Sequence, residues 1–160
     1  MSAPAAADAV TVTVWSDYVC PFCYLALPTL DRLQAEEGVA IEWRAYELRP
    51  EPAPLADYSD PRIRQAWEQA VLPMAEERGL TLRRPSGPIR SRRAHEAAFV
   101  AEAAGFGDPY RRALFRARWE DDRRIDEDAT LIALAAEVGI PEDAFAPALT
   151  QGHALRAVLE

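Results

Sequence analysis

The two cysteines of this chain lie close together in the segment Cys20-Pro21-Phe22-Cys23. Two thiols at this spacing can form a reversible disulfide, and a thiolate can attack another disulfide. A thiol at the start of a helix ionises readily, because unpaired backbone N–H groups and the helix dipole favour negative charge there. The pattern therefore indicates a redox-active dithiol, provided that the chain places it at a helix N-terminus.

The elements around the dithiol are predicted to provide that placement. Valines alternate with threonine and tryptophan over residues 10–15, which predicts a buried strand. Helical spacing runs from Pro21 to Glu37, and Gly38 is expected to end this helix. Residues 39–46 read as a second strand. Strand, helix and strand over this length form a βαβ unit with two parallel strands, so the dithiol lies where the first strand gives way to the helix.

The residues of the motif have separate expected roles. Cys20 is expected to be the exposed attacking thiolate, with a lowered pKa, and Cys23 the buried resolving thiol one turn deeper. Pro21 suits the first helical turn, where its missing N–H has no helical partner. Phe22 offers an apolar surface beside the sulfur for substrates. Tyr24 could face either towards the dithiol or away from it.

Two carboxylates are candidates for accepting a proton from Cys23. Asp17 lies just before the motif, and Glu47 lies at the end of the second predicted strand. The alternative for Asp17 is a cap on the turn that leads into the helix, which is the favoured interpretation. A zinc site needs four ligands, and only His95 and His153 could join the cysteines, without zinc-finger spacing. We therefore expect no metal.

Composition excludes several classes of function. The net charge of −8 argues against nucleic acid and anionic membranes as partners. The chain has no lysine, so no Schiff base can form. It has no apolar run of membrane-spanning length, and the first seven residues lack the pattern of a secretory signal. We expect a cytoplasmic protein, where two cysteines are more often catalytic or metal-binding than structural.

The rest of the chain is predicted to be helical and to belong to one domain, 1–160, with the βαβ unit at 9–48 and a helical part at 61–160. Residues 1–8 look disordered, and residues 47–60 are irregular and rich in proline. Four tryptophans are expected in the core, and a run of mixed charges, 116–128, is expected to be a solvated face. The tryptophans are Trp15, Trp43, Trp67 and Trp119.

Six helices are predicted in the helical part. The first three cover residues 61–79 with a kink at Pro73, residues 92–104 with Ser91 as N-cap, and a stretch from Asp108 whose Tyr110, Leu114 and Ala117 face inward. The others cover residues 128–138 with Asp128 as cap, residues 141–149 and residues 154–160.

The segment from Val14 to Tyr24, V-W-S-D-Y-V-C-P-F-C-Y, resembles the active-site segment of the DsbA-like thiol oxidoreductases. More narrowly it is similar to the FrnE-type branch, which also holds the 2-hydroxychromene-2-carboxylate isomerases. Residues 46–50, 93–96 and 131–139 support the resemblance, which covers most of residues 10–140. It implies an α/β, thioredoxin-like fold with a large helical insertion, and it places His95 in that insertion near the dithiol. The alternative for His95 is a polar helix residue bonded to a neighbouring loop.

The resemblance also has a departure. The family fold continues after the helical insertion with a cis-proline loop, two strands and a last helix, and nothing after Gly139 reads that way. The C-terminal strands are therefore expected to be missing, which would leave the edge of the first strand open. Three explanations stay open: a truncated chain, a second chain that covers the edge, or repacked helices.

The expected function is that of a cytoplasmic thiol–disulfide oxidoreductase, a reductase or isomerase of protein or small-molecule disulfides. No bound cofactor is expected, and glutathione is the candidate redox partner. A first alternative is a glutathione-dependent isomerase or transferase of the same family, although that branch typically has serine where this chain has Cys20. A second is a non-catalytic redox-sensing or interaction module that forms a homodimer through the open strand edge.

Overall fold

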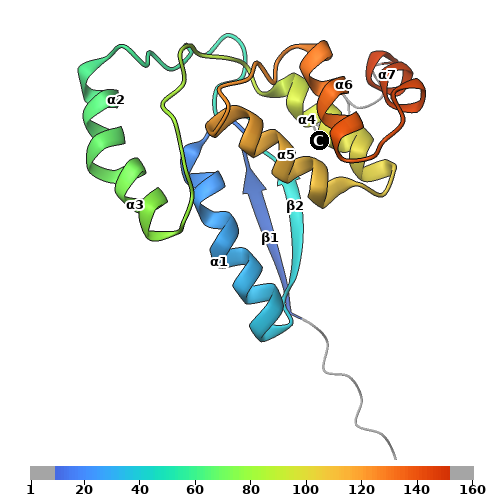
Figure 1. Cartoon of the computed structure of the whole chain (residues 1–160), viewed down its shortest axis with the longest axis horizontal. Coiled ribbons are helices and arrows are strands. Elements are labelled where there is room, and N and C mark those ends of the chain that lie inside the picture. The colour runs from blue at the N-terminus through green and yellow to red at the C-terminus, as the bar shows by residue number, and fades with distance from the viewer. Residues whose placement is uncertain (1–9, 152–160) are drawn as a thin grey trace, which may run out of the picture.

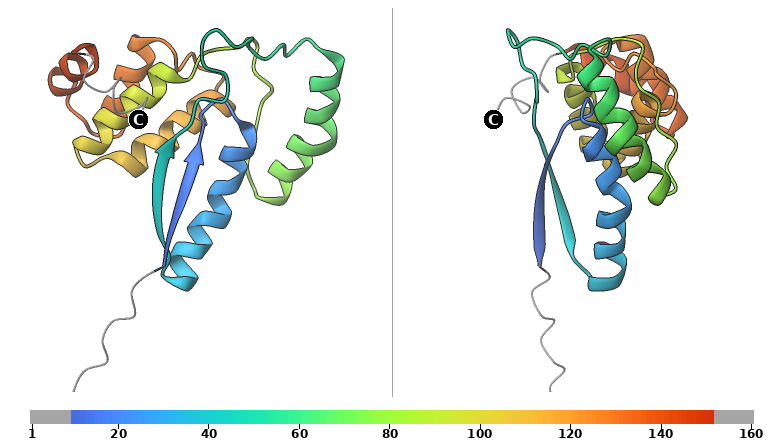
Figure 2. Two further views of the ribbon diagram at one scale, coloured as in Figure 1. Left: turned by 180° about the vertical axis from the view of Figure 1, so that it is seen from behind. Right: turned by 90° about the vertical axis from the view of Figure 1, so that its left-hand side faces the viewer.

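The computed structural model describes residues 10–151 and contains a βαβ unit beside a larger group of helices (Figure 1). Strands β1 (Thr11–Ser16) and β2 (Ala40–Ala45) pair in parallel and are joined by α1 (Pro21–Glu37). Helix α1 lies along one side of this two-stranded sheet (Figure 2). The predicted βαβ unit is confirmed.

Both ends of α1 follow from single residues. Cys20 is the N-cap, with extended backbone angles, and Pro21 opens the first turn. At the other end Gly38 adopts φ 65°, a left-handed conformation that costs glycine little, and its N–H donates to the carbonyl of Leu33. The helix therefore starts directly after the first cysteine, as the sequence predicts.

The segment after the proline-rich stretch forms one helical arm with an irregular centre. It consists of α2 (Pro61–Ala66), a π-helical turn (Trp67–Val71) and α3 (Leu72–Glu77). In the π turn the N–H of Leu72 donates to the carbonyl of Trp67, five residues earlier. Pro73 follows at once and has no N–H to continue the regular pattern. A kink was predicted at this proline, and the structure has a π turn just before it.

The remaining helices form a bundle around α5. Helix α5 packs against α4 and α6, and it also contacts α1 of the βαβ unit. It contributes fully buried side chains to the core, among them Tyr110, Leu114, Phe115 and Trp119. The bundle consists of α4 (Arg92–Ala103), α5 (Gly107–Trp119), α6 (Asp128–Glu137) and α7 (Glu142–Thr150).

The prediction of a buried first strand is wrong in part. Val12 and Val14 are only half-buried, and Trp15, expected in the core, is 65% exposed. The reason is topological, since β1 has one strand partner among residues 10–151 and its side chains alternate between two faces of the sheet. Trp67 and Trp119 are buried, as expected, while Trp43 is partly buried beneath the Arg111 guanidinium, 4.6 Å from its ring centre.

The mixed-charge run at 116–128 is not uniformly solvated either. Arg118 is 1% exposed, and its guanidinium donates to the carbonyl of Gly87 at 2.8 Å. It also lies 3.5 Å from the carboxylate of Asp122. Asp122 lies four residues after Arg118, but Gly87 comes from the loop before α4, so spacing along one helix does not reveal this second partner.

Two expected helix caps use their side chains elsewhere. Ser91 and Asp128 lie at the starts of α4 and α6, but neither side chain caps its helix. Asp128 instead accepts hydrogen bonds from Arg93 at 2.6 and 2.7 Å.

Some sequence predictions fall on parts of the chain without a described structure. The expected disordered lead-in at 1–8, the helix at 154–160 and His153 lie outside the described residues. Within residues 10–151, no helix combines the length and the apolar character needed to cross a bilayer.

Phe115→Ala tests how much the contact of α5 with the βαβ unit contributes to stability. The Phe115 ring packs against Tyr18, in the loop before the dithiol, at 5.0 Å between ring centres, and stacks on Tyr24 of α1 at 5.5 Å. Removing this ring from a fully buried site is expected to lower the free energy of unfolding by about 3–5 kcal/mol. Denaturant unfolding measures the loss. The same change at half-exposed Phe99 is the matched control, with an expected effect within about 0.5 kcal/mol. Equal losses in the two variants would contradict this role of Phe115.

Candidate active site

The two cysteines are free thiols at the N-terminal end of α1. The backbone N–H of Cys20 donates to the carbonyl of Asp17, and the N–H of Cys23 donates to the carbonyl of Cys20, both at 3.2 Å. Both cysteines are partly buried, so Cys20 is less exposed and Cys23 less buried than expected. Cys23, unlike Cys20, packs against the hydrophobic core, in the sense that the sequence predicts.

The thiols share one proton between them. The pKa of Cys23 is lowered to about 6, chiefly because the Cys20 S–H donates to it, with help from the backbone N–H of Asp17 and the hydroxyl of Ser16. The pKa of Cys20 is raised, because its proton is held in that hydrogen bond and the site is partly buried. The first ionisation of the reduced pair belongs to both sulfurs together, so the expectation that Cys20 carries the lowered pKa stays a prediction.

Backbone groups nevertheless face Cys20 as the helix start predicts. The N–H groups of Cys23 and Phe22 act on its sulfur and favour its ionised form. Once Cys23 takes the shared proton, Cys20 can carry the negative charge beside these donors. The geometry thus allows either sulfur of the pair to be the thiolate.

The side chain of Asp17 fixes the loop that leads into the dithiol. It is 2% exposed, and its carboxylate accepts hydrogen bonds from the N–H of Val19 at 3.2 Å and of Leu48 at 2.6 Å. The Nε2 atom of His95, on α4, lies 3.3 Å from the same carboxylate. The preferred interpretation of Asp17 as a turn cap is confirmed.

Burial and hydrogen bonding oppose each other at Asp17. Burial alone raises the pKa of this carboxyl, but the hydrogen bond and charge interaction with His95, and the bonds from Leu48 and Ser91, outweigh it. The net result is a lowered pKa, so Asp17 is an ionised carboxylate at neutral pH. It is a permanent acceptor in the wall of the site.

The other predicted residues divide between the site and its supports. Phe22 is 49% exposed beside the thiols, as expected for a contact surface. Tyr24 faces away from them, since its ring stacks on Phe115 and its hydroxyl donates to Glu120. Glu47 accepts a hydrogen bond from the guanidinium of Arg92 at 2.5 Å, so its carboxylate fastens α4 to the end of β2.

Three groups at the site were not singled out by sequence reasoning. They are the hydroxyl of Ser16 beside Cys23, the hydroxyl of Ser91 and the backbone N–H of Leu48, both beside Asp17. Ser16 is 8% exposed, and its hydroxyl has no hydrogen-bond partner in the described part of the chain. The position of Ser16 at the end of β1, directly before the loop that leads to the dithiol, was the one available signal.

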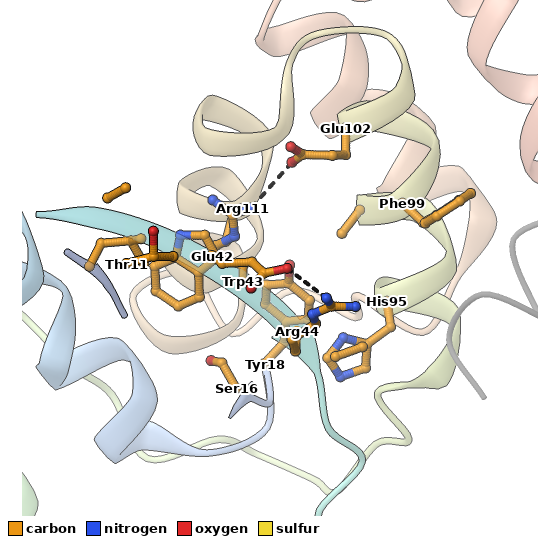
Figure 3. Close-up of a pocket in the computed structure, with 14 residues that line it drawn as sticks. Thr11, Ser16, Tyr18, Glu42, Trp43, Arg44, His95, Phe99, Glu102 and Arg111 are labelled. Carbon is orange, nitrogen blue, oxygen red and sulfur yellow. Dashed lines mark hydrogen bonds and ion pairs between the residues drawn. The ribbon is translucent and has the colours of Figure 1, made fainter. Parts of the chain in front are cut away.

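A groove of about 580 Å³ lies beside the dithiol loop, between the sheet and α4 (Figure 3). His95 and Tyr18 form one end, and Trp43 and Arg111 lie further along it. Arg111 forms an ion pair with Glu102 at 3.3 Å, so the groove carries little unbalanced charge. Among residues 10–151 no cluster of three or more histidine, cysteine, aspartate or glutamate side chains is arranged to hold a metal.

The chain is similar to a known family and to a protein of known sequence. The family described as DSBA-like thioredoxin domain matches residues 11–159. The Bacillus subtilis (strain 168) protein "Uncharacterized protein YwbO" is 34% identical over 143 residues, which is 88% of this chain and 72% of that protein.

Solved structures share the fold. A probable DsbA oxidoreductase of Streptomyces coelicolor superposes with a TM-score of 0.79 at 24% identity, covering 93% of this chain and 71% of that one. The cytosolic disulfide reductase DsbM of Pseudomonas aeruginosa, solved with GSH, gives a TM-score of 0.71 at 25% identity, covering 93% of this chain and 75% of that one.

Cys20→Ala tests the shared proton. Without the S–H donor the thiolate of Cys23 loses the largest interaction that stabilises it, so its pKa is expected to rise from about 6. The rate of alkylation by iodoacetamide, followed across pH, reports this pKa. Cys20→Ser keeps an O–H donor and should give a smaller rise. An unchanged midpoint in Cys20→Ala would show that backbone donors alone stabilise Cys23.

Proposed function

Because the chain belongs to the family of DSBA-like thioredoxin domains, we propose that it is a thiol–disulfide oxidoreductase whose redox centre is the pair Cys20 and Cys23. The observation that carries this proposal is a free, partly accessible dithiol at the N-terminus of α1, with a lowered first pKa. A low pKa supplies thiolate at neutral pH, and thiolate is the reactive species in disulfide exchange.

Cys20 is proposed as the attacking residue. Its proton passes to Cys23 along the hydrogen bond that joins the two sulfurs. The Cys20 thiolate then attacks one sulfur of a substrate disulfide, forms a mixed disulfide and releases the other substrate sulfur as a thiolate. Half-exposed Phe22 offers the substrate an apolar contact at this point.

Cys23 is proposed to resolve the mixed disulfide. After losing its proton to solvent, its thiolate attacks the sulfur of Cys20, which forms the Cys20–Cys23 disulfide and releases the second substrate thiolate. The substrate gains two electrons and the dithiol loses two. Two molecules of glutathione, oxidised to one glutathione disulfide, would return the protein to its reduced form.

The direction proposed is reduction or isomerisation. Stabilising the thiolate stabilises the reduced protein, so its internal disulfide is readily reduced by a glutathione pool. In a reducing compartment such as the cytoplasm the dithiol would then be kept ready to attack substrate disulfides. The DsbM structure solved with GSH supports glutathione as the candidate reductant.

Reduction of insulin disulfides by dithiothreitol tests the activity. Wild type is expected to accelerate it, and Cys20→Ser is expected to abolish the acceleration because the attacking sulfur is gone. Cys23→Ser should lose turnover but accumulate a mixed disulfide through Cys20, visible by mass spectrometry. A mixed disulfide that forms through Cys23 instead would reverse the two roles. Glutathione-dependent isomerase turnover that survives Cys23→Ser would favour the isomerase alternative.

A specific observation favours an additional interaction role through β1. The edge of β1 that faces away from β2 has no strand partner among the described residues, and Val10 and Trp15 beside it are 66% and 65% exposed. Residues 11–16 carry no charge, whereas β2 carries the ion pair of Arg44 with Glu42 at 2.6 Å. Charges at an edge oppose pairing, so β1 lacks the usual protection. We propose that a second copy pairs there, antiparallel and with two-fold symmetry.

Sedimentation over a range of concentrations tests this pairing. Wild type is expected to form a dimer, and Trp15→Lys should shift it to monomer by placing a charge at the apolar edge. The same change at exposed Leu72, on α3, is the matched control and should leave the dimer intact. A wild type that stays monomeric at every concentration would contradict the pairing.

A further inference from the structure

The main chain of Asp17 touches both cysteines. Its carbonyl accepts the N–H of Cys20 at 3.2 Å, and its own N–H acts on the sulfur of Cys23. A shift of this one residue would therefore change the surroundings of both sulfurs at once. The arrangement of the two sulfurs therefore depends on the position of Asp17.

The side chain of Asp17 is held from three directions. Val19 binds it from within the loop, Leu48 from the segment after β2, and His95 from α4. The first two donors are backbone N–H groups, which any residue would supply. His95 is the donor that depends on residue type, together with the hydroxyl of Ser91 from the start of the same helix.

The surroundings of His95 favour a fixed role. Its side chain is 4% exposed, and its ring packs against Tyr18 with 4.9 Å between ring centres. Because an ionised carboxylate can only accept, the Nε2 atom that faces Asp17 must carry a hydrogen. The imidazole is therefore held in one orientation by a tilted contact with the Tyr18 ring, beside which it lies in Figure 3, and by a directed hydrogen bond to Asp17.

We propose that His95 is a positioning residue for the dithiol: it holds the Asp17 carboxylate from α4, so that the Asp17 main chain stays against Cys20 and Cys23. The proposal deepens the proposed redox function, on which its importance rests, and it names a link between the helical bundle and the redox centre. His95 acts through Asp17 and touches neither sulfur in this account.

Two effects of removing the His95 donor have the same sign. A loosened loop would withdraw the Asp17 N–H from Cys23, and the negative charge of Asp17 would lose a hydrogen-bond donor. Each disfavours a thiolate nearby and so raises the pKa of the dithiol. A less stable thiolate means a less stable reduced form, so the reduction potential should fall.

Other charged groups around His95 are largely paired. On the side of α5, Arg111 is paired with Glu102 of α4, and both act on Tyr18. On the side of the segment after β2, Glu47 is paired with Arg92. On the side of β2, Arg44 is paired with Glu42 at 2.6 Å. The other titratable groups here are Tyr18, whose pKa burial raises to about 12, the carboxylate of Asp17 and the dithiol itself. A change in the titration of the cysteines can therefore be traced to the link through Asp17.

Two variants test the proposal. His95→Leu removes the donor, and His95→Gln keeps an N–H donor without an imidazole. Alkylation rates across pH and the potential against glutathione are measured for both, with circular dichroism to confirm the fold. His95→Leu is expected to raise the midpoint pH and to slow alkylation below that midpoint by about threefold or more, the equivalent of about half a pKa unit. His95→Gln should restore most of the loss.

Two results would overturn the proposal: an unchanged midpoint in folded His95→Leu, or an equal shift in His95→Gln. Alkylation needs no turnover, so these results are separate from the insulin assay. If wild type titrates as described but fails to reduce insulin, the proposed function fails while the link to His95 stands. If insulin is reduced but the midpoint of the alkylation titration does not change in His95→Leu, only the link to His95 is contradicted.

A titration followed by NMR tests the link without any substitution at His95, so it stays informative if the His95 variants do not fold. The chain has two histidines, so His153→Gln assigns the imidazole resonances of His95 in a ¹H–¹⁵N spectrum. These resonances are expected to show an inflection at the pH where the dithiol ionises, and to lose it when both cysteines are replaced by alanine. Absence of the inflection in wild type would contradict the link.

Discussion

The buried carboxylate of Asp17 joins the parts of the fold that meet at the dithiol. An ionised group with 2% exposure is tolerated only when its hydrogen-bonding capacity is met by well-placed donors. Here the donors come from the loop itself, from the segment after β2 and from α4. If one of these three segments moved away, the buried charge of Asp17 would lose a hydrogen-bond donor. This shared carboxylate is why the two-stranded sheet and the helical bundle meet at one site.

Further contacts join the same segments, although they do not involve Asp17. Arg92, at the start of α4, binds Glu47 after β2, and Arg90 donates to the carbonyls of Arg49 and Ala53. These guanidinium groups fasten the irregular proline-rich segment to the entrance of α4. The helical part is therefore a wall of the site, and it packs on α1 through α5.

The sequence was sufficient for features that depend on neighbouring residues. The junction at Cys20 and Pro21, and the helix end at Gly38, follow from local backbone preferences. Features set by distant partners were out of reach. Trp15 is exposed because burial of a strand depends on its neighbours in the sheet, and Arg118 is buried because Gly87 supplies an acceptor from another loop. The same limit applies at the site, where local reasoning on the helix dipole assigned the lowered pKa to Cys20. The hydrogen bond between the thiols makes the first ionisation a property of the pair, and the groups of Ser16 and Asp17 also act on it.

The central claim is that Cys20 and Cys23 form one reversible redox couple within a single chain. Equilibration of the protein with defined ratios of reduced and oxidised glutathione, followed by thiol labelling and mass spectrometry, tests it most directly. We expect one two-electron transition to an internal disulfide, with a potential between about −270 and about −120 mV, the range spanned by related scaffolds. Cysteines that stay reduced throughout, or that form only stable mixed disulfides with glutathione, would contradict it.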